Sequence, residues 1–327
     1  MGPSEWGRMR GYGIDLARVC RNGIVRGLLL GASALCGAII FGVVGVGYLY
    51  EQSTGGNGEG AVARHSCSRI VSLAPSLTEV AFAVGLGEAV VAVSGYDSFP
   101  PLVTKLPKIG GALDASPERI ASYRPTVVLA LTEMTDIVSA LDKLGIPRIV
   151  ADHRSVSGIL DSLIQVGERC GVERAAIELR RERYNLIEDV KRRNSGQGER
   201  VLVTVASAAS LTDLAQLHIS GTDGFYAELI RFTGAIPVVE SPSIPLANVS
   251  MEGVVALQPS LIFEVFDRQI SIDERLIRLA RWGEWPVIPA VAEGRIVTLD
   301  TDYAAIPGPR FDRLLLDIEG AMTRDGG

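Results

Sequence analysis

Histidine and cysteine, the side chains most often used in nucleophilic and metal chemistry, are sparse in this sequence. The 327-residue chain holds three histidines and four cysteines, and their spacing matches no metal site. The sequence also lacks the G-x-S-x-G, H-E-x-x-H and phosphate-loop patterns that mark hydrolases, zinc proteases and nucleotide-binding enzymes. We therefore expect a binding protein rather than an enzyme, with no metal site and no cofactor.

Two glutamates occur in matched local patterns. Ser116-Pro117-Glu118 precedes an R-P step and the apolar run TVVLAL, and Ser250-Met251-Glu252 precedes a Q-P step and the run LIFEVF. Each pattern predicts a short helix capped by serine, with glutamate in its first turn, and then a strand. Capping alone explains one such glutamate. A glutamate in each half of the chain suggests a matched pair of surface carboxylates that grip a partner from both sides.

The elements that position these residues alternate between strand and helix. Apolar runs predict strands at 69–73, 90–94, 126–131, 148–151, 201–206, 261–266 and 295–299. Helices are predicted at 76–84, 117–123, 133–144, 156–169, 172–193, 224–232, 252–257 and 311–321. Ser76 and Glu79 have the spacing of a capping box for the first helix. This alternation predicts an α/β fold with mostly parallel sheets, covered by helices on both faces.

One helix divides the chain. The charged run over 172–193 keeps helical spacing for about 22 residues, whereas an ordinary globular helix has about 11–12. We expect an N-terminal lobe at 68–171, an interlobe helix at 172–195 and a C-terminal lobe at 196–327. The two α/β lobes are then joined by a rigid helix rather than by a loose linker.

A continuous apolar stretch precedes both lobes. The 24 residues of 27–50 carry no charge, which predicts one membrane-spanning helix. Five arginines in the tail 1–26 place the N-terminus in the cytoplasm and the body outside, in the periplasm. The glycine-rich residues 51–67 are a predicted linker. A cleaved signal peptide is the alternative, with an A-x-A site at 61–63, but the long apolar core favours an uncleaved anchor.

Charge and cysteines follow the same division. The net charge is −6, and the first 50 residues carry +3, which leaves −9 for the remainder. An acidic body disfavours nucleic acid as a partner, because phosphate binding needs clustered lysine and arginine. Cys67 and Cys170 fall in the exported part, where disulfides form. They either pair with each other or remain as two buried thiols.

An ordered set of motifs resembles a known family. The segment RIVSLAPSLTE at 69–79 resembles the opening of the helical-backbone, class III substrate-binding proteins of ABC importers for cobalamin, haem and iron-siderophores. Order and spacing match from about residue 68 to 322, and the cobalamin-binding branch is the most similar. The other matching motifs are VSGYDSFP at 93–100, KIGG at 108–111, both glutamate patterns, GTDGF at 221–225, Gly234 and PGPR at 307–310.

The resemblance implies roles for individual residues. A ligand is held between two lobes that move little, and Glu118 and Glu252 dock to arginines of the permease. Tyr96 and Tyr303 match positions that clamp the ligand, and Asp97 is a further candidate contact. Arg310 aligns with an arginine of structural role. His153, like Asp97, lies on a loop after a strand and is a candidate contact on that ground.

Three ligand positions depart from the family pattern. Where the family has tryptophans, this chain has Ala112, Leu131 and Leu246. The tryptophans of the body, Trp282 and Trp285, lie in a segment expected to pack in the core or on the surface. A flat ligand favours aromatic walls, so these departures bear on corrinoid specificity and not on the fold.

The sequence therefore predicts a membrane-tethered solute-binding protein outside the cytoplasmic membrane. It captures cobalamin, another corrinoid or a related metal chelate such as haem or an iron-siderophore, and delivers it to an ABC permease. The alternative is a membrane-anchored ligand sensor or scavenger without a permease of its own, which would keep the cleft without needing both glutamates.

Overall fold

The computed structural model describes residues 66–323, other than 112–114, 207–213, 215–216, 222–223 and 240–245, and leaves the side chains of 206, 246 and 247 undescribed. The predicted tail 1–26, the predicted anchor 27–50 and most of the predicted linker 51–67 lie outside the described residues. Within the described ranges, no helix is long and apolar enough to cross a membrane.

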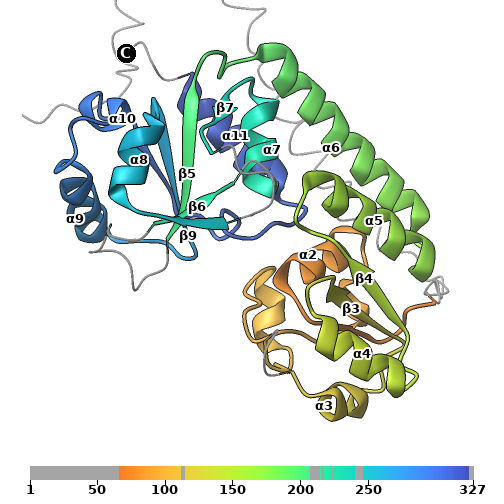
Figure 1. Ribbon diagram of the computed structural model, residues 1–327. Coiled ribbons are helices and arrows are strands. Elements are labelled where there is room, and N and C mark those ends of the chain that lie inside the picture. The colour runs from red at the N-terminus through yellow and green to blue at the C-terminus, as the bar shows by residue number, and fades with distance from the viewer. Residues whose placement is uncertain are drawn as a thin grey trace, which may run out of the picture. The chain divides into compact units, whose positions relative to one another are not determined.

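The N-terminal lobe is built on a four-stranded parallel sheet with strand order β2-β1-β3-β4 (Figure 1). The strands are β1 (Ile70–Ser72), β2 (Val90–Ala92), β3 (Val127–Leu131) and β4 (Arg148–Ala151). The helices are α2 (Pro75–Ala83), α3 (Pro117–Ser122), α4 (Thr135–Lys143) and α5 (Val156–Cys170), with 3₁₀ turns η1 (Gly87–Ala89) and η2 (Pro101–Lys105). Helices α2 and α5 pack together on one face, and α3 and α4 pack together on the other. Such a double covering is why β1 and β3 are almost wholly apolar and buried.

The C-terminal lobe has a sheet with strand order β10-β9-β5-β6-β8, and β7 pairs with β5 off this path. Its strands are β5 (Arg200–Ala206), β6 (Leu217–Ser220), β7 (Ile236–Pro237), β8 (Leu246–Val249), β9 (Leu261–Phe266) and β10 (Ile296–Leu299). Its helices are α7 (Phe225–Phe232), α8 (Met251–Leu257), α9 (Ile272–Trp282), α10 (Pro289–Ala292) and α11 (Phe311–Met322). Helices α7 and α11 lie together on one face, and α8, α9 and α10 gather on the other (Figure 1). Trp282 is fully buried in the core beneath α9, and Trp285 packs partly buried against the same core.

The two α/β lobes with mostly parallel sheets, joined by a long helix, are confirmed, but one edge of the second sheet differs from the expectation. The pairs β5–β6 and β6–β8 are antiparallel, and neither β6 nor β8 was predicted. Both strands have four residues and carry polar side chains such as His218 and Asn248. Short mixed edges of this kind lack the apolar run that reveals a buried parallel strand.

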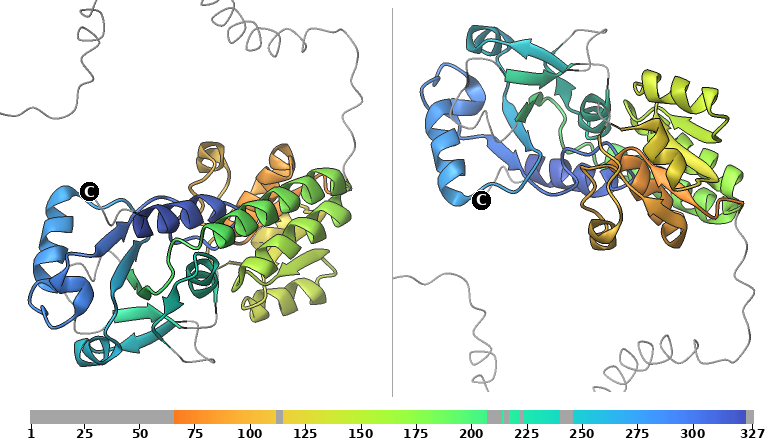
Figure 2. Two further views of the ribbon diagram at one scale, coloured as in Figure 1. Left: turned by 90° about the horizontal axis from the view of Figure 1, so that it is seen from above. Right: turned by 90° about the horizontal axis from the view of Figure 1, so that it is seen from below.

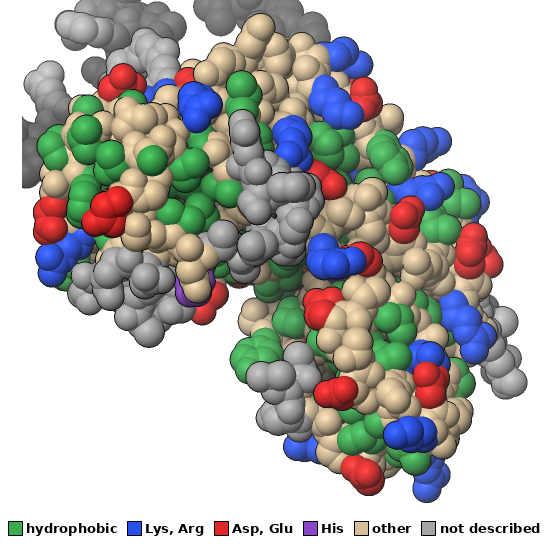
Figure 3. Space-filling model, viewed as in Figure 1, with side chains coloured by type: hydrophobic (Ala, Val, Ile, Leu, Met, Phe, Trp, Pro, Cys, Tyr) green, Lys and Arg blue, Asp and Glu red, His purple; other side chains and the backbone are tan. Residues whose placement is uncertain are grey.

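Helix α6 (Glu173–Arg193) runs along the outside of both lobes, first beside α5 and then towards α11 (Figures 1 and 2). Its 21 residues span roughly 30 Å. Arg183 pairs with Asp312 at 3.2 Å, and Arg193 binds both carboxylate oxygens of Glu319 at 2.6 and 2.7 Å. On the face of the molecule that Figure 3 shows, acidic and basic side chains are scattered rather than gathered into patches.

A single apolar core continues from one lobe into the other. The same cluster of buried residues includes Ile70 and Leu129 of the N-terminal sheet, Ile187 of α6, and Phe263 and Phe311 of the C-terminal lobe. Gly167 of α5 lets α6 approach closely, since a Cβ there would lie 2.5 Å from the Cβ of Ala176. A core shared in this way fixes the lobes more firmly than a connecting helix alone.

A disulfide joins Cys67, just before β1, to Cys170 at the end of α5. Both residues are buried. The bond closes a loop with a sequence separation of 103 residues, so it encloses the whole N-terminal sheet.

The predicted capping box at the start of the first helix is wrong. Helix α2 begins at Pro75, its N-cap is Ala74, and no side chain caps it. Ser76 therefore lies inside the helix. The side chain of Glu79 turns into the protein and pairs with Arg310 instead, because a buried arginine offers the carboxylate two strong hydrogen bonds.

Candidate functional site

A cavity of about 910 Å³ lies between the lobes. Its walls come from both sides: Pro75, Tyr96 and Ser98 from the N-terminal lobe, and Asp267, Arg268, Gln269, Asp300, Thr301, Asp302, Tyr303, Ala305 and Ile306 from the C-terminal lobe. This volume is near the upper end of the roughly 300–1,000 Å³ that ligand pockets enclose. The cavity can therefore accept a large ligand that touches both lobes.

The strands explain why these residues meet. Pro75 follows β1 and Tyr96 follows β2, while Asp267 and Asp300 directly follow β9 and β10. The carboxyl ends of parallel strands share one edge of each sheet, and loops at that edge form the binding crevice of open α/β folds. In this protein the two crevice edges belong to the same interlobe cavity.

The two predicted clamp tyrosines both line this cavity, from opposite lobes. The side chain of Tyr96 is 75% exposed, so its ring is available to a ligand. Tyr303 is held more firmly, because its hydroxyl donates to Asp317 Oδ2 at 2.7 Å. Burial, aided by the hydrogen bond to Asp317, raises the pKa of Tyr303. One tyrosine is thus free to adapt and the other is fixed.

Asp97, the other predicted contact of this loop, does not line either interlobe hollow. Its carboxylate is buried and accepts the Ser94 hydroxyl, and Lys108 Nζ donates to its backbone carbonyl at 2.7 Å. Burial raises the pKa of Asp97. These contacts hold the loop that presents Tyr96.

A second, smaller hollow of about 220 Å³ adjoins the first. Ser76 and Pro307 line it, and their chain neighbours Pro75 and Ile306 line the larger cavity. The other lining residues are Leu131, Glu133, His153, Arg154, Ser220, Gly224, Phe225 and Tyr226. Leu131, predicted to stand at a ligand position, is therefore in the interlobe cleft. We use the term cleft for the two hollows together.

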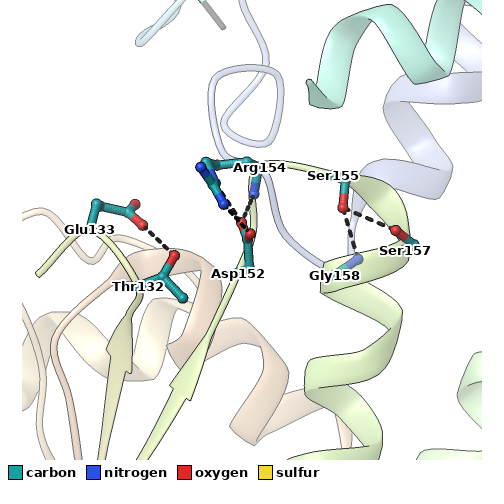
Figure 4. A network of polar contacts seen from close by, with 7 residues as sticks. All are labelled: Thr132, Glu133, Asp152, Arg154, Ser155, Ser157 and Gly158. Atoms are coloured by element: carbon teal, nitrogen blue, oxygen red, sulfur yellow. Dashed lines mark hydrogen bonds and ion pairs between the residues drawn. The ribbon is translucent and has the colours of Figure 1, made fainter. Parts of the chain in front are cut away.

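The polar rim of the smaller hollow is a local network at the ends of β3 and β4 (Figure 4). The backbone N–H and Nε of Arg154 both donate to Asp152 Oδ1 at 2.9 Å. Thr132 donates to Glu133 at 3.3 Å on the neighbouring strand end. Ser155 caps α5 by accepting the backbone N–H of Gly158 at 3.0 Å. The arginine is therefore held by its own loop.

His153 is buried below the smaller hollow between two serines. Its Nδ1 lies 2.8 Å from Ser76 Oγ, and its Nε2 lies 2.9 Å from Ser162 Oγ. The Ser162 hydroxyl also donates to the carbonyl of Ile159 at 2.7 Å. Burial lowers the pKa of His153 to about 4. The imidazole is consequently neutral and spans from β4 to α2 and α5 as a structural link.

Arg310 forms a buried clamp between the lobes. Its Nε and Nη2 donate to both carboxylate oxygens of Glu79, at 3.0 and 2.6 Å, and its Nη1 donates to Asp302 at 2.7 Å. The guanidinium lies over the ring of Phe99 at 3.8 Å and over that of Tyr303 at 5.6 Å. The structural role expected for Arg310 thus takes a definite form: it connects α2 to the loop that carries Tyr303.

Two further contacts fix the lobes near the cleft. Gly308 sits so close to α2 that a Cβ would lie 3.1 Å from Glu79 Oε2 and 3.4 Å from the Cα of Ser76. On the other side, Glu228 of α7 accepts the backbone N–H of Val156, the first residue of α5, at 2.7 Å. Burial raises the pKa of Glu228. The cleft floor is therefore braced by side chains from both lobes.

The two predicted docking glutamates are exposed on different lobes, Glu118 on α3 and Glu252 on α8. Ser116 accepts the backbone N–H of Arg119 at 3.2 Å, and Ser250 accepts that of Gly253 at 3.4 Å, as the serine caps predicted. A hydrogen bond from the Ser116 hydroxyl lowers the pKa of Glu118, and the backbone N–H of Glu252 lowers that of Glu252. Both carboxylates are ionised and open to a partner.

Two of the predicted ligand positions fall where the structure describes no side chain. Ala112 lies outside the described residues, and Leu246 belongs to β8 but its side chain is not described. Conversely, Asp267, Arg268 and Asp300 line the cavity unpredicted. Their position directly after predicted strands was the available signal.

Two α/β lobes, one long connecting helix and a cavity at the strand ends define a two-lobed substrate-binding fold. Residues 70–303 match the periplasmic binding protein family. The chain belongs to that family.

Curated relatives share about a quarter of their residues with this chain. The vitamin B12-binding protein of Vibrio campbellii is 26% identical over 77% of this chain and 88% of its own length. An uncharacterized ABC transporter substrate-binding lipoprotein of Bacillus subtilis is 27% identical over 74% of this chain and 76% of its own. The vitamin B12-binding protein of Pectobacterium carotovorum is 29% identical, covering 74% and 84%.

Solved structures agree in fold. The periplasmic vitamin B12 binding protein BtuF of Vibrio cholerae superposes with a TM-score of 0.67, at 21% identity, over 79% of this chain and 97% of its own. A periplasmic heme binding protein of Pseudomonas aeruginosa gives a TM-score of 0.69, at 19% identity, over 80% and 94%. At this level of identity the likeness concerns the fold alone.

Proposed function

We propose that this protein captures a corrinoid or a related metal chelate, such as haem or an iron-siderophore, and delivers it to an ABC importer. The observation that carries the proposal is the interlobe cavity of about 910 Å³ with Tyr96 and Tyr303 on opposite walls. Large flat chelates bury their faces against aromatic rings. The relatives named for vitamin B12 binding support the corrinoid as the first ligand to test.

Further aromatic rings belong to the cleft. Phe225 and Tyr226 line the smaller hollow and pack edge to face with ring centroids 5.1 Å apart. Both residues are buried, at 4% and 8% exposed, so they form part of the wall of the smaller hollow near Leu131 and not an open aromatic face. The exposed ring available to a chelate is that of Tyr96 in the larger hollow.

Docking is proposed to occur through Glu118 and Glu252. Both side chains are exposed first-turn carboxylates of serine-capped helices, and they sit on different lobes, so a permease with two basic patches can contact both lobes at once. Complementary charges of this kind guide the orientation and the rate of association.

The protein is proposed to act at the outer face of the cytoplasmic membrane. The tail 1–26 stays inside, the segment 27–50 spans the membrane, and the linker 51–67 carries the two lobes, 68–171 and 196–327, around the helix 172–195. A tether keeps the binding protein near its permease and so raises its effective concentration there. Fractionation with alkaline carbonate tests this arrangement: an anchored chain stays with membranes, and a cleaved one is released.

Calorimetry of the full-length chain tests the capture of a ligand. Cyanocobalamin, cobinamide, haemin and a ferric siderophore are titrated into the wild type and into a Tyr96→Ala/Tyr303→Ala variant. We expect one ligand class to bind with one-to-one stoichiometry, and the variant to bind it at least tenfold more weakly, since each lost ring removes about 1 kcal/mol or more. Tyr184→Ala, on the exposed surface of α6, is the matched control.

The docking proposal has its own test. The ligand-loaded protein is added to its permease in liposomes, and stimulation of the ATPase is measured. Glu118→Ala/Glu252→Ala should abolish stimulation while leaving ligand affinity unchanged. If the variant stimulates the ATPase as strongly as the wild type, the docking role is wrong. If the wild type itself gives no stimulation, a sensor or scavenger without a permease is favoured.

A further inference from the structure

The arginine of the larger hollow is already engaged by carboxylates. Arg268 donates to Glu274 from Nη2 at 2.6 Å and from Nη1 at 3.2 Å. Asp267, beside it on the cavity wall, adds a second negative charge, and the two carboxylates together favour the charged guanidinium. An anionic ligand would have to displace Glu274 before it could use this arginine.

The arginine of the smaller hollow is engaged in the same way. Arg154 is bound through its backbone N–H, Nε and Nη2 to the carboxylate of Asp152 (Figure 4). Glu133, which also lines the hollow, is the second carboxylate that acts on it. Arg310, beneath Tyr303, repeats the pattern with Glu79 and Asp302.

Each cleft arginine is thus faced by two carboxylates. Among the described residues that line the two hollows, the remaining basic group is His153. Its burial between Ser76 and Ser162 leaves it uncharged at neutral pH. The described lining residues therefore carry an excess of negative charge, and each of their arginines is paired with a carboxylate. Arg313 lies outside this lining, with its guanidinium 6.0 Å from the Tyr303 ring centroid.

The sequence of the internal segments outside the described residues holds no basic side chain. By sequence, 112–114, 207–213, 215–216, 222–223 and 240–245 contain no lysine, arginine or histidine. They do contain four acids, namely Asp114, Asp213, Asp223 and Glu240.

We propose that the cleft selects its metal chelate by charge, accepting neutral or cationic chelates and excluding anionic ones. The inference rests on the proposed function and narrows it: a corrinoid with amide side chains fits, whereas haem with two propionates or a ferric catecholate does not. Discrimination arises because an anion meets like charges and loses its own hydration without gaining a free guanidinium.

A pair of ligands of the same shape tests the proposal. Cyanocobalamin and its monocarboxylic acid, in which one peripheral amide is hydrolysed, differ by a single negative charge. Calorimetry of the full-length chain at pH 7 should show the acid binding roughly three- to tenfold more weakly. The difference should widen at low ionic strength, where charges are less screened.

Variants of the cleft wall test whether its carboxylates cause the difference in affinity between the two corrinoids. Asp267→Asn/Glu133→Gln removes two exposed lining carboxylates and should bring the two affinities within about twofold of each other. Glu182→Gln/Glu188→Gln, on the exposed surface of α6, makes the same change of charge away from the cleft and should leave the difference unchanged.

Further chelates separate the charge rule from the proposed binding function. A cationic ferric trihydroxamate such as ferrioxamine B is compared with haemin and with a ferric tricatecholate. If the carboxylated corrinoid, haemin or the tricatecholate binds as tightly as its neutral or cationic counterpart, the charge rule is wrong and the binding function stands. If no chelate in the whole panel binds, the proposed function fails and the charge rule fails with it.

Discussion

Replacing Arg310 tests how the two lobes are held together. Arg310→Met keeps an apolar stem between Phe99 and Tyr303 but removes the guanidinium. Four hydrogen bonds are lost, two to the carboxylate of Glu79 and two to Asp302. The side chain of Glu79 is only 2% exposed and that of Arg310 8%, so water cannot replace what is removed.

The expected magnitude follows from this burial. Breaking a buried ion pair by removing one partner costs about 3–5 kcal/mol, because the other charge stays in the interior uncompensated. The free energy of unfolding of Arg310→Met should therefore fall by about that amount at pH 7. The loss should shrink as pH falls towards 4, since protonation relieves the stranded Glu79.

Urea unfolding followed by circular dichroism measures the effect, and a double variant isolates it. Glu79→Gln/Arg310→Met leaves no stranded charge and should recover at least about 2 kcal/mol relative to the single variant. Arg192→Met, which removes an exposed arginine of α6 paired with Asp189, should change stability by less than about 0.5 kcal/mol. A loss below about 1 kcal/mol in Arg310→Met, or no recovery in the double variant, would refute the clamp.

Three further predictions concern buried groups of the two lobes. His153 has a folded pKa of about 4 against 6.5 when unfolded, so its neutral form stabilises the fold above pH 6.5; about 3 kcal/mol is lost as pH falls from 6.5 to 4. His153→Gln should show a correspondingly weaker acid dependence in urea titrations, and an unchanged dependence would contradict the assignment. Replacing Cys67 and Cys170 by alanine should lower the free energy of unfolding by about 4–5 kcal/mol, as expected for a loop of this length, and should abolish the effect of dithiothreitol on thermal unfolding. Gly308→Ala should cost about 1–3 kcal/mol, because its Cβ would press on Glu79 and Ser76; a Tm equal to that of wild type would show that the loop has room.

The fold could be predicted in large part because its main signals are local. Uninterrupted apolar strands such as TVVLAL and LIFEVF, each followed by helical spacing, indicate parallel strands covered on both faces. The length of α6 is visible as an unbroken charged run. Strands β6 and β8 were missed because they are short antiparallel strands with polar side chains, and such strands carry little of this signal.

The site was harder to predict, because its contacts join distant parts of the chain. Glu79 and Arg310 are 231 residues apart, and the sequence around Glu79 has the spacing of a local cap. Whether Glu79 caps its own helix or pairs with a distant residue depends on which side chains pack against that helix in the folded protein. Tyr96 and Tyr303 were identified through the family resemblance, and both line the larger hollow from loops that follow strands.

The carboxylate partners of the cleft arginines were also hard to predict from the sequence. Asp152 and Arg154 are two residues apart in the sequence, so their pairing can be predicted once the loop is known to be exposed. Arg268 and Glu274 lie on either side of the start of α9, and their pairing depends on how the loop turns there. Net charge alone could therefore not reveal which arginines remain free to bind a ligand.

Blocking the cavity tests the central claim most directly. Ala305 lines the larger hollow, and Ala305→Trp adds an indole to that space, whereas Ala175→Trp adds the same group on the exposed surface of α6. In calorimetric titrations of the full-length chain with cyanocobalamin, cobinamide, haemin and a ferric siderophore, we expect one-to-one binding by the wild type and by Ala175→Trp. Ala305→Trp should lose that binding with its thermal stability retained. Equal affinity in all three proteins, or no binding of any chelate by the wild type, would contradict capture of a metal chelate between the lobes.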